Sequence, residues 1–161
     1  MICDVDLSRC RGCGRCQNVC RQNVVELVDG YAAISKSAQC VGCGLCVGVC
    51  PWGALSLDNF SPKKVLKQLM LMEGNTLYII CEKCSKPQIT EDKAIQVPCV
   101  NVIGKYMLQE IIANGFERIY VSSCRGIQCS QYQQSFENTI RQWKEYFVSC
   151  YMEPQQIIIQ E

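Results

Sequence analysis

The chain has 161 residues, of which 15 are cysteine and none is histidine, and its formal net charge is +1. Without histidine, the sequence excludes a Ser-His-Asp triad, a Cys-His protease pair, a histidine-ligated zinc enzyme and a Rieske centre. A nearly neutral chain also lacks the strongly basic character of proteins that coat nucleic acid or anionic membranes. We therefore expect no nucleic-acid binding and no membrane insertion.

Cysteine at this density indicates either a disulfide scaffold or bound metal. The N-terminal residues, Met1 to Asp6, include acidic side chains and contain no apolar signal core. The longest apolar runs are too short to span a bilayer, and the number of cysteines is odd. These features favour the reducing cytoplasm as the location and metal as the reason for the cysteines.

An internal repeat with a period of 30 residues lies near the N-terminus. Its first copy runs from Cys10 to Cys20 and its second from Cys40 to Cys50, and both have the spacing C-x2-C-x2-C-x3-C. Three thiolates at this spacing can surround one face of an iron–sulfur cube, while the intervening glycines let the loop curl. The fourth cysteine falls in the helical stretch after the loop and is expected to point elsewhere.

This spacing resembles that of the bacterial two-cluster ferredoxins, in which the fourth cysteine of each run ligates the other cluster. The resemblance covers residues 1–60 and implies an α+β ferredoxin-type domain with two 4Fe–4S clusters. It implies one cluster on Cys10, Cys13, Cys16 and Cys50, and the other on Cys40, Cys43, Cys46 and Cys20. Arg21 stands where the family usually has proline, as at Pro51, and this departure removes no ligand. A zinc or disulfide module fits the repeat poorly, because zinc sites use C-x2-C pairs.

The expected clusters also bear on stability. An apolar core rarely suffices for a domain of about 60 residues, so loss of the clusters should unfold residues 1–60. Exposed clusters should also make the protein sensitive to oxygen. Cys3 lies outside the repeat on an expected first strand, where we expect it to be a buried apolar filler. Trp52 closely follows Cys50 and is expected to shield a cluster.

A linker helix is expected over residues 61–75. Ser61 and Pro62 are typical of an N-cap and a first helical position. Apolar residues then follow near helical spacing, namely Val65, Leu66, Leu69, Met70 and Met72. We expect the methionines to serve packing rather than function.

Residues 76–161 alternate expected strands with expected helices, which predicts a small α/β domain with a mostly parallel sheet. The expected strands are 77–81, 94–99, 117–122 and 156–159, and the expected helices are 102–114 and 131–147. The segment 85–93 is short for a first crossover, so its helix should be missing or reduced to a turn.

Five cysteines follow the ends of three of these strands: Cys81, Cys84, Cys99, Cys124 and Cys129. The carboxyl ends of parallel strands share one edge of a sheet, where open α/β folds bind ligands, so the five thiols should converge. An iron–sulfur centre is the favoured interpretation. A structural zinc, a thioredoxin-like redox pair and inert buried thiols remain alternatives.

The same cysteines resemble those of the delta subunit of the methyl-viologen-reducing hydrogenase, the MvhD/FlpD family. The resemblance covers about residues 76–148, with Gly126 and Tyr132 in matching places. It implies a 2Fe–2S cluster and a bridge from a hydrogenase or formate dehydrogenase to heterodisulfide reductase machinery. Ser130 stands where the family usually has histidine, and five cysteines for four positions leave one thiol spare. Cys150 follows the last helix and is expected to be structural.

We expect an electron-transfer subunit rather than a catalytic chain, since the sequence contains neither GxGxxG nor GxxxxGK(S/T). It would relay single electrons between a low-potential oxidoreductase, such as a hydrogenase or formate dehydrogenase, and a heterodisulfide-reductase-like or flavin-containing partner. Such a multi-subunit complex would belong to anaerobic metabolism. The alternative is a ferredoxin-linked thiol–disulfide reductase with a dithiol at Cys81/Cys84 or Cys124/Cys129. A redox-sensing regulatory module is disfavoured, because the basic residues are scattered.

Overall fold

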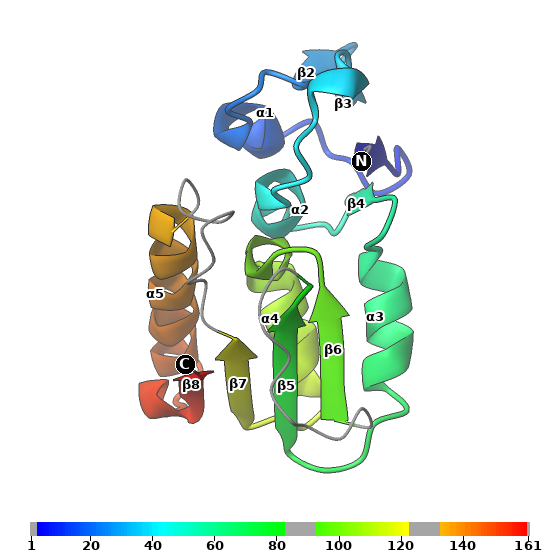
Figure 1. The fold of residues 1–161 in the computed structure, drawn as a ribbon. Coiled ribbons are helices and arrows are strands. Elements are labelled where there is room, and N and C mark those ends of the chain that lie inside the picture. The colour runs from blue at the N-terminus through cyan, green and yellow to red at the C-terminus, as the bar shows by residue number, and fades with distance from the viewer. Residues whose placement is uncertain (1–2, 83–92, 123–132, 161) are drawn as a thin grey trace.

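The computed structural model describes residues 3–82, 93–122 and 133–160, and it divides into two differently built parts (Figure 1). The first part contains β1 (Cys3–Val5), α1 (Arg15–Val19), β2 (Val25–Val28), β3 (Tyr31–Ile34), the short 3-10 helix η1 (Ser37–Gln39), α2 (Leu45–Val49) and β4 (Leu55–Leu57). We call this the N-terminal part. Helix α3 (Pro62–Leu69) then leads to the C-terminal part.

The two copies of the repeat interlock in the N-terminal part. Strand β1 pairs antiparallel with β4, so the first strand of one copy meets the last strand of the other, and β2 pairs antiparallel with β3. Each cysteine loop leads into a short helix, α1 or α2, and the two helices contact each other. This exchange of strands is the reason why the fourth cysteine of one copy lies beside the loop of the other.

Helix α3 begins as predicted, with Ser61 in extended backbone and Pro62 at the first helical position. Val65 and Leu69 are buried on its inner face, while Lys63 forms an ion pair with Asp6 at 2.6 Å. The helix ends at Leu69, and the side chain of Met70 is 72% exposed. The expectation that Met70 packs is therefore wrong. The apolar residues continue past the end of α3, and beyond that end they no longer lie on the buried face of the helix.

The C-terminal part is an α/β unit with a four-stranded sheet in the order β6-β5-β7-β8, and every strand pair is parallel. Its elements are β5 (Thr76–Cys81), β6 (Ala94–Val97), the 3-10 helix η3 (Val100–Val102), α4 (Lys105–Ala113), β7 (Arg118–Ser122), α5 (Gln133–Ser149), the 3-10 helix η5 (Pro154–Gln156) and β8 (Ile157–Gln160). The predicted fold class is confirmed. Most of the short crossover segment 85–93 lies outside the described residues.

Helix α4 begins later than the predicted helix 102–114. Val100–Val102 forms the 3-10 helix η3, and α4 starts at Lys105 after Gly104. Val102 and Ile103 are completely buried, because this segment packs between α2 of the N-terminal part and α5 and β5 of the C-terminal part. Their apolar character therefore reflects the packing of the segment before α4 rather than a turn of α4.

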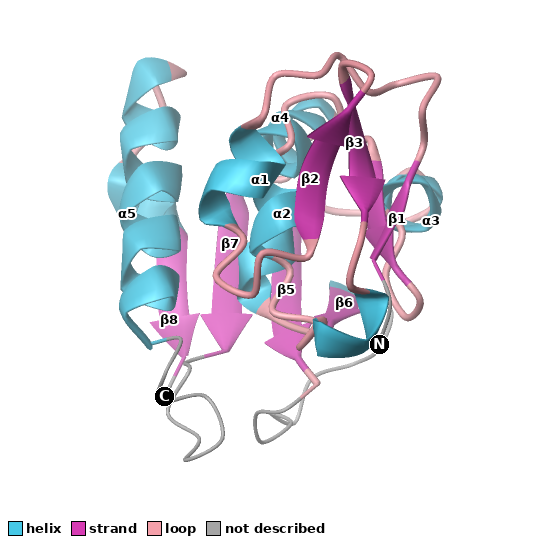
Figure 2. Ribbon diagram, turned by 90° about the horizontal axis from the view of Figure 1, so that it is seen from above, coloured by secondary structure: helices cyan, strands magenta, loops and turns pink. Residues whose placement is uncertain are grey.

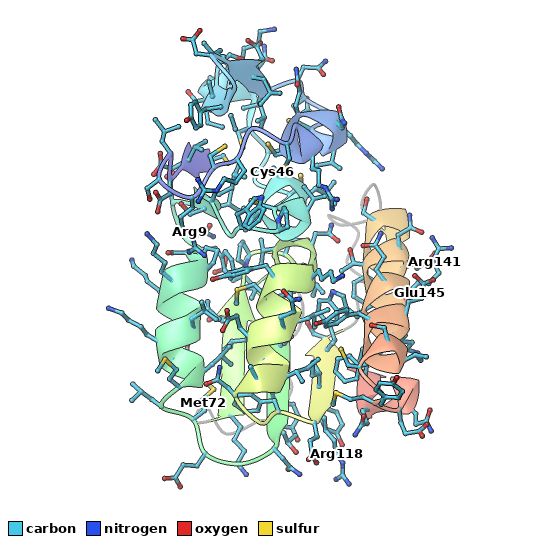
Figure 3. The ribbon with its side chains drawn as sticks, turned by 180° about the vertical axis from the view of Figure 1, so that it is seen from behind. Arg9, Cys46, Met72, Arg118, Arg141 and Glu145 are labelled. Atoms are coloured by element: carbon cyan, nitrogen blue, oxygen red, sulfur yellow. The ribbon has the colours of Figure 1, made fainter. Side chains whose placement is uncertain are left out.

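The two parts share one continuous apolar core. Helix α2 packs on η3, and the carboxyl ends of β5, β6 and β7 point toward the N-terminal part (Figure 1). Seen from above, α2 stands in front of the sheet (Figure 2). Arg9 lies at the same junction (Figure 3), where its guanidinium donates to the hydroxyl of Tyr106 at 2.8 Å and sits 5.2 Å from that ring's centroid. Among the described helices, none is long and apolar enough to cross a membrane.

Candidate metal centres

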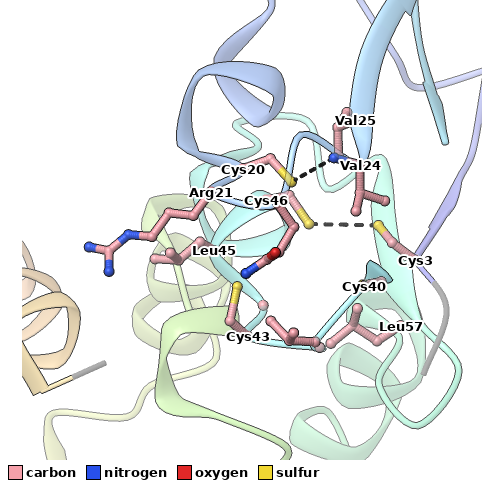
Figure 4. Close-up of a pocket in the computed structure, with 14 residues that line it drawn as sticks. Cys3, Cys20, Arg21, Val24, Val25, Cys40, Cys43, Leu45, Cys46 and Leu57 are labelled. Carbon is pink, nitrogen blue, oxygen red and sulfur yellow. Dashed lines mark hydrogen bonds between the residues drawn. The ribbon is translucent and has the colours of Figure 1, made fainter. Parts of the chain in front are cut away.

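The cysteines of the repeat gather around two cavities. Site I is lined by Cys10, Cys13, Cys16 and Cys50. Site II is lined by Cys20, Cys40, Cys43 and Cys46, together with Cys3 (Figure 4). The structure thus brings together each group of four that the ferredoxin resemblance implies, and it adds a fifth thiol to site II.

The two cysteine loops have the same backbone shape, which the sequence period of 30 residues anticipates. Glycines at matching positions adopt the left-handed conformation with nearly equal φ angles: 63° at Gly12 and 65° at Gly42, then 73° at Gly14 and 75° at Gly44. Glycine is favoured at such positions, since other residues adopt a positive φ at a cost. The second glycine of each pair precedes a helix of five residues that carries the third cysteine.

A backbone N–H group donates a hydrogen bond to the sulfur of the fourth cysteine in each run. The N–H of Val24 donates to Sγ of Cys20 at 3.3 Å, and the N–H of Ala54 donates to Sγ of Cys50 at 3.3 Å. Both donors come four residues after the sulfur, so this contact also follows the repeat. Amide donors stabilise negative charge on sulfur, and such donors help to set the potential of an iron–sulfur cluster.

Burial keeps several of these thiols protonated when no metal competes. Desolvation raises the pKa of Cys16 to about 11 and also raises the pKa of Cys43. The pKa of Cys46 is raised first by its hydrogen bond with Cys3 and then by burial. Iron must therefore displace protons to bind, which makes assembly of a cluster dependent on pH.

The donor set of each site fits a cluster better than a single ion. Over the described parts of the chain, no three Cys, Asp or Glu side chains converge closely enough to hold one metal ion. In a 4Fe–4S cube each of the four thiolates binds a different iron. The four sulfur atoms therefore stand farther apart than the ligands of a single ion. Four cysteines around a curled loop, with amide N–H groups directed at sulfur, fit such a cube.

The two sites differ in their exposure. Cys13 in the first loop is exposed, whereas Cys43 at the matching position is half-buried. At the other three matching positions the order is reversed: Cys10, Cys16 and Cys50 of site I are buried, whereas Cys40, Cys46 and Cys20 of site II are partly exposed. The second loop nevertheless lies against the C-terminal part, where Val102 is so close that a Cβ on Gly44 would approach its Cγ1 to 2.3 Å. Trp52 lines site I while remaining 48% exposed, so it covers that site only partly. We call site II the inner site, because its loop packs against the C-terminal part, and site I the outer site.

The structure locates two of the five cysteines predicted at the sheet edge. Cys81 ends β5 and is buried, and its Sγ lies 3.6 Å from the carbonyl oxygen of Pro98. Cys99 follows the neighbouring strand β6 and is partly exposed. The amide of Cys81 donates to the hydroxyl of Ser122, at the end of β7, at 2.9 Å. Three strand ends therefore meet at this edge.

The remaining cysteines are less informative. Cys84, Cys124 and Cys129 lie outside the described residues, so their predicted convergence stays a prediction. Cys150 follows α5 and is partly exposed. Sequence reasoning missed the contact of Cys3 with site II and the role of Ser122 at the sheet edge. No spacing signal identifies either residue.

Two segments of the chain, residues 9–54 and 39–102, match the 4Fe-4S dicluster domain. The chain belongs to this family. The two matches overlap on the second cysteine run and together span more than half of the chain. The N-terminal half is thus a 4Fe-4S dicluster domain whose cysteines imply two 4Fe–4S clusters, which is consistent with electron transfer. The chain matches no curated protein.

Proposed function

We propose that this dicluster protein is an electron-transfer subunit that relays single electrons between two protein partners. One is a low-potential oxidoreductase such as a hydrogenase or formate dehydrogenase, and the other is a heterodisulfide-reductase-like or flavin-containing protein. The observation that carries the proposal is the packing of site II against the strand-end edge of the C-terminal part. This packing places the outer site, the inner site and the strand-end edge with Cys81 and Cys99 in a fixed order.

The ligand assignment follows the two cavities. Cys10, Cys13, Cys16 and Cys50 hold the outer cluster, while Cys20, Cys40, Cys43 and Cys46 hold the inner one. Bound clusters supply one-electron redox chemistry. The chain supplies the thiolates, the amide donors and the apolar surroundings that set their potentials.

A third iron–sulfur centre, of 2Fe–2S type, is proposed at the strand-end edge. Cys81 and Cys99 supply two of its ligands, and the others come from Cys84, Cys124 and Cys129. The backbone connects this edge to site II over a short distance, because η3 begins directly after Cys99 and its last residue, Val102, packs on Gly44. The inner cluster is therefore the one that communicates with the C-terminal part.

Iron analysis and electron paramagnetic resonance of anaerobically purified protein test the third centre. Two cubes contribute about 8 Fe, and a 2Fe–2S centre raises the total to about 10 Fe. Cys99→Ser should remove the third signal, whereas Cys150→Ser is the matched control and should retain it. A protein with about 8 Fe and with zinc in its C-terminal part would disprove the third centre and leave the two cubes in place.

One partner is proposed to dock over site I. The exposed Cys13 is flanked by the exposed side chains of Arg11 and Arg15. Trp52 and Leu27, which also line this site, are 48% and 38% exposed. An apolar patch beside cations fits a partner whose docking face combines apolar side chains with carboxylates. Such charge pairing raises association rates at low ionic strength.

A charge reversal tests this docking face. With an acidic redox partner, Arg15→Glu should slow second-order electron transfer by about 10-fold or more at low salt, and added salt should weaken the difference. Arg118→Glu is the matched control, because Arg118 lies at the opposite end of the molecule (Figure 3). Equal rates for both variants at low salt would place the docking face elsewhere.

A further inference from the structure

Cys3 is a fifth thiol at the inner site. It lies on β1, opposite Leu57 of β4, and only 3% of its surface is exposed. Its Sγ is 3.6 Å from Sγ of Cys46, and it lines the same cavity as the four repeat cysteines of site II (Figure 4). The expectation of a buried residue is correct for Cys3, but apolar filling does not account for a sulfur–sulfur contact.

The chemistry of the loaded site decides which sulfur donates. A cysteine bound to iron is a thiolate and carries no proton, so Cys46 can only accept. Cys3 stands outside the repeat and keeps its S–H group. Its other polar contact, the carbonyl oxygen of Asp4, lies at 4.0 Å, the limit for a sulfur hydrogen bond. Water has little access to this buried thiol, so the thiolate of Cys46 is its best acceptor.

We propose that Cys3 tunes the inner cluster by donating an S–H···S hydrogen bond to iron-bound Cys46. This inference rests on the ligand assignment of the proposed function. Reduction adds negative charge to the cluster and its sulfurs, and a hydrogen-bond donor stabilises that charge. Cys3 therefore raises the reduction potential of the inner cluster above the value that it would have without the donor.

Among the described residues that line the outer site, the four repeat cysteines are the only thiols. With the period of 30 residues, Ala33 on β3 of the second copy corresponds to Cys3 on β1. Ala32 contributes only its backbone N–H, which donates to Sγ of Cys10 at 3.4 Å. The repeat thus makes the two sites alike in ligands and backbone, and the Cys3 side chain is a difference between them. Cys3 acts as a positioning and tuning residue, not as a ligand.

Two substitutions separate the hydrogen bond from simple packing. Cys3→Val keeps an apolar side chain of similar size on a strand and removes the S–H group, while Cys3→Ala removes both the donor and the volume. Each variant is purified anaerobically as the full chain, and its iron content is measured first. Both should keep the iron content of the unmodified protein, because Cys3 is not a ligand.

A redox titration followed by electron paramagnetic resonance gives the decisive readout. In both variants the midpoint of the inner cluster should fall, so that its reduced-to-oxidised ratio at a fixed potential drops about 10-fold, which is about 59 mV for one electron. The midpoint of the outer cluster should not move. The infrared difference between the unmodified protein and Cys3→Val should show an S–H stretching band at lower frequency than that of a free thiol.

Three results would overturn the inference. An unchanged inner midpoint in Cys3→Val would show that no functional donor was removed. A fall in Cys3→Ala alone would assign the effect to volume and water access. Loss of inner-cluster iron in Cys3→Val would make Cys3 a ligand or a support of the site. Failure of the proposed function is distinct, since the unmodified protein would then lack the signals of two cubes.

Discussion

At the scale of single residues, the two tryptophans of the chain stand in opposite environments. Trp143 on α5 is 2% exposed, and its indole N–H donates to the carbonyl oxygen of Ile103 at 2.9 Å. Trp52 is 48% exposed beside site I. One therefore belongs to the core of the C-terminal part, whereas the other belongs to the surface around the outer cluster.

Trp143→Phe should destabilise the protein, since it leaves the buried carbonyl oxygen of Ile103 without its donor. Such a loss costs about 1–3 kcal/mol, and about 1 kcal/mol corresponds to about 2–4 °C in Tm at this chain length. Thermal unfolding of the cluster-loaded protein at a fixed scan rate measures it. Trp52→Phe, the matched control, should change Tm by less than about 2 °C. Equal decreases in both variants would contradict this account of Trp143.

The repeat cysteines could be predicted from the sequence, but the role of Cys3 could not. The spacing of a cysteine run is a local property, and the exchange of the fourth cysteine between the two runs is what the ferredoxin resemblance implies. The contact between Cys3 and Cys46 depends instead on the register in which β1 meets β4, where Cys3 lies opposite Leu57. That register joins residues more than 50 positions apart, and no local pattern encodes it.

At the scale of elements, α2 and the segment before α4 meet through two glycines. A Cβ on Gly48 would lie 2.0 Å from the carbonyl oxygen of Asn101, and a Cβ on Gly104 would collide with the backbone of Gly48. Backbone therefore touches backbone where the dicluster domain meets the C-terminal part. Neither glycine has a positive φ, so close approach, and not conformation, is what requires glycine.

Gly48→Ala should force the two parts to separate locally. Overpacking of this kind costs about 1–3 kcal/mol, although alanine itself favours the helix. We expect a lower Tm and an altered signal from the inner cluster. The matched control is Asn18→Ala, at the corresponding place on α1, where the side chain is exposed and the change should be nearly neutral. A Gly48→Ala variant as stable as this control would show that α2 and η3 are not in close contact.

The elements of the C-terminal part could be predicted where one face of a local segment is apolar. The strands satisfy this condition, and the helices α4 and α5 account for the parallel pairing of the later strands. The start of α4 could not be predicted, because the burial of Val102 and Ile103 comes from the packing of η3 on α2, α5 and β5 and not from a turn of α4. The same limit applies to Met70, whose apolar side chain remains in solvent beyond the end of α3.

At the scale of the whole molecule, the two parts differ in what stabilises them. Over its described residues, the dicluster domain forms two two-stranded sheets, with strands of three or four residues. Such sheets are marginal without further support. The C-terminal part has a four-stranded parallel sheet whose central strands β5 and β7 are completely buried at Leu77, Ile79, Ile119 and Val121. The clusters should therefore be structural for the first part and not for the second.

Removal of the clusters should unfold the molecule in a graded manner. After chelation of iron in air, amides of β1 to β4 and α2 should lose protection against hydrogen exchange, because their sheets are too small to persist. Amides of β5, β7 and α5 should keep most of their protection. Amides of η3 should show intermediate protection, since η3 keeps its contacts with the C-terminal part but loses those with α2. Hydrogen exchange with mass spectrometry resolves these segments, with the anaerobic loaded protein as control. Uniform loss across the chain would show that the shared core makes both parts one folding unit, and retained protection in β1 to β4 would show that the clusters are not structural.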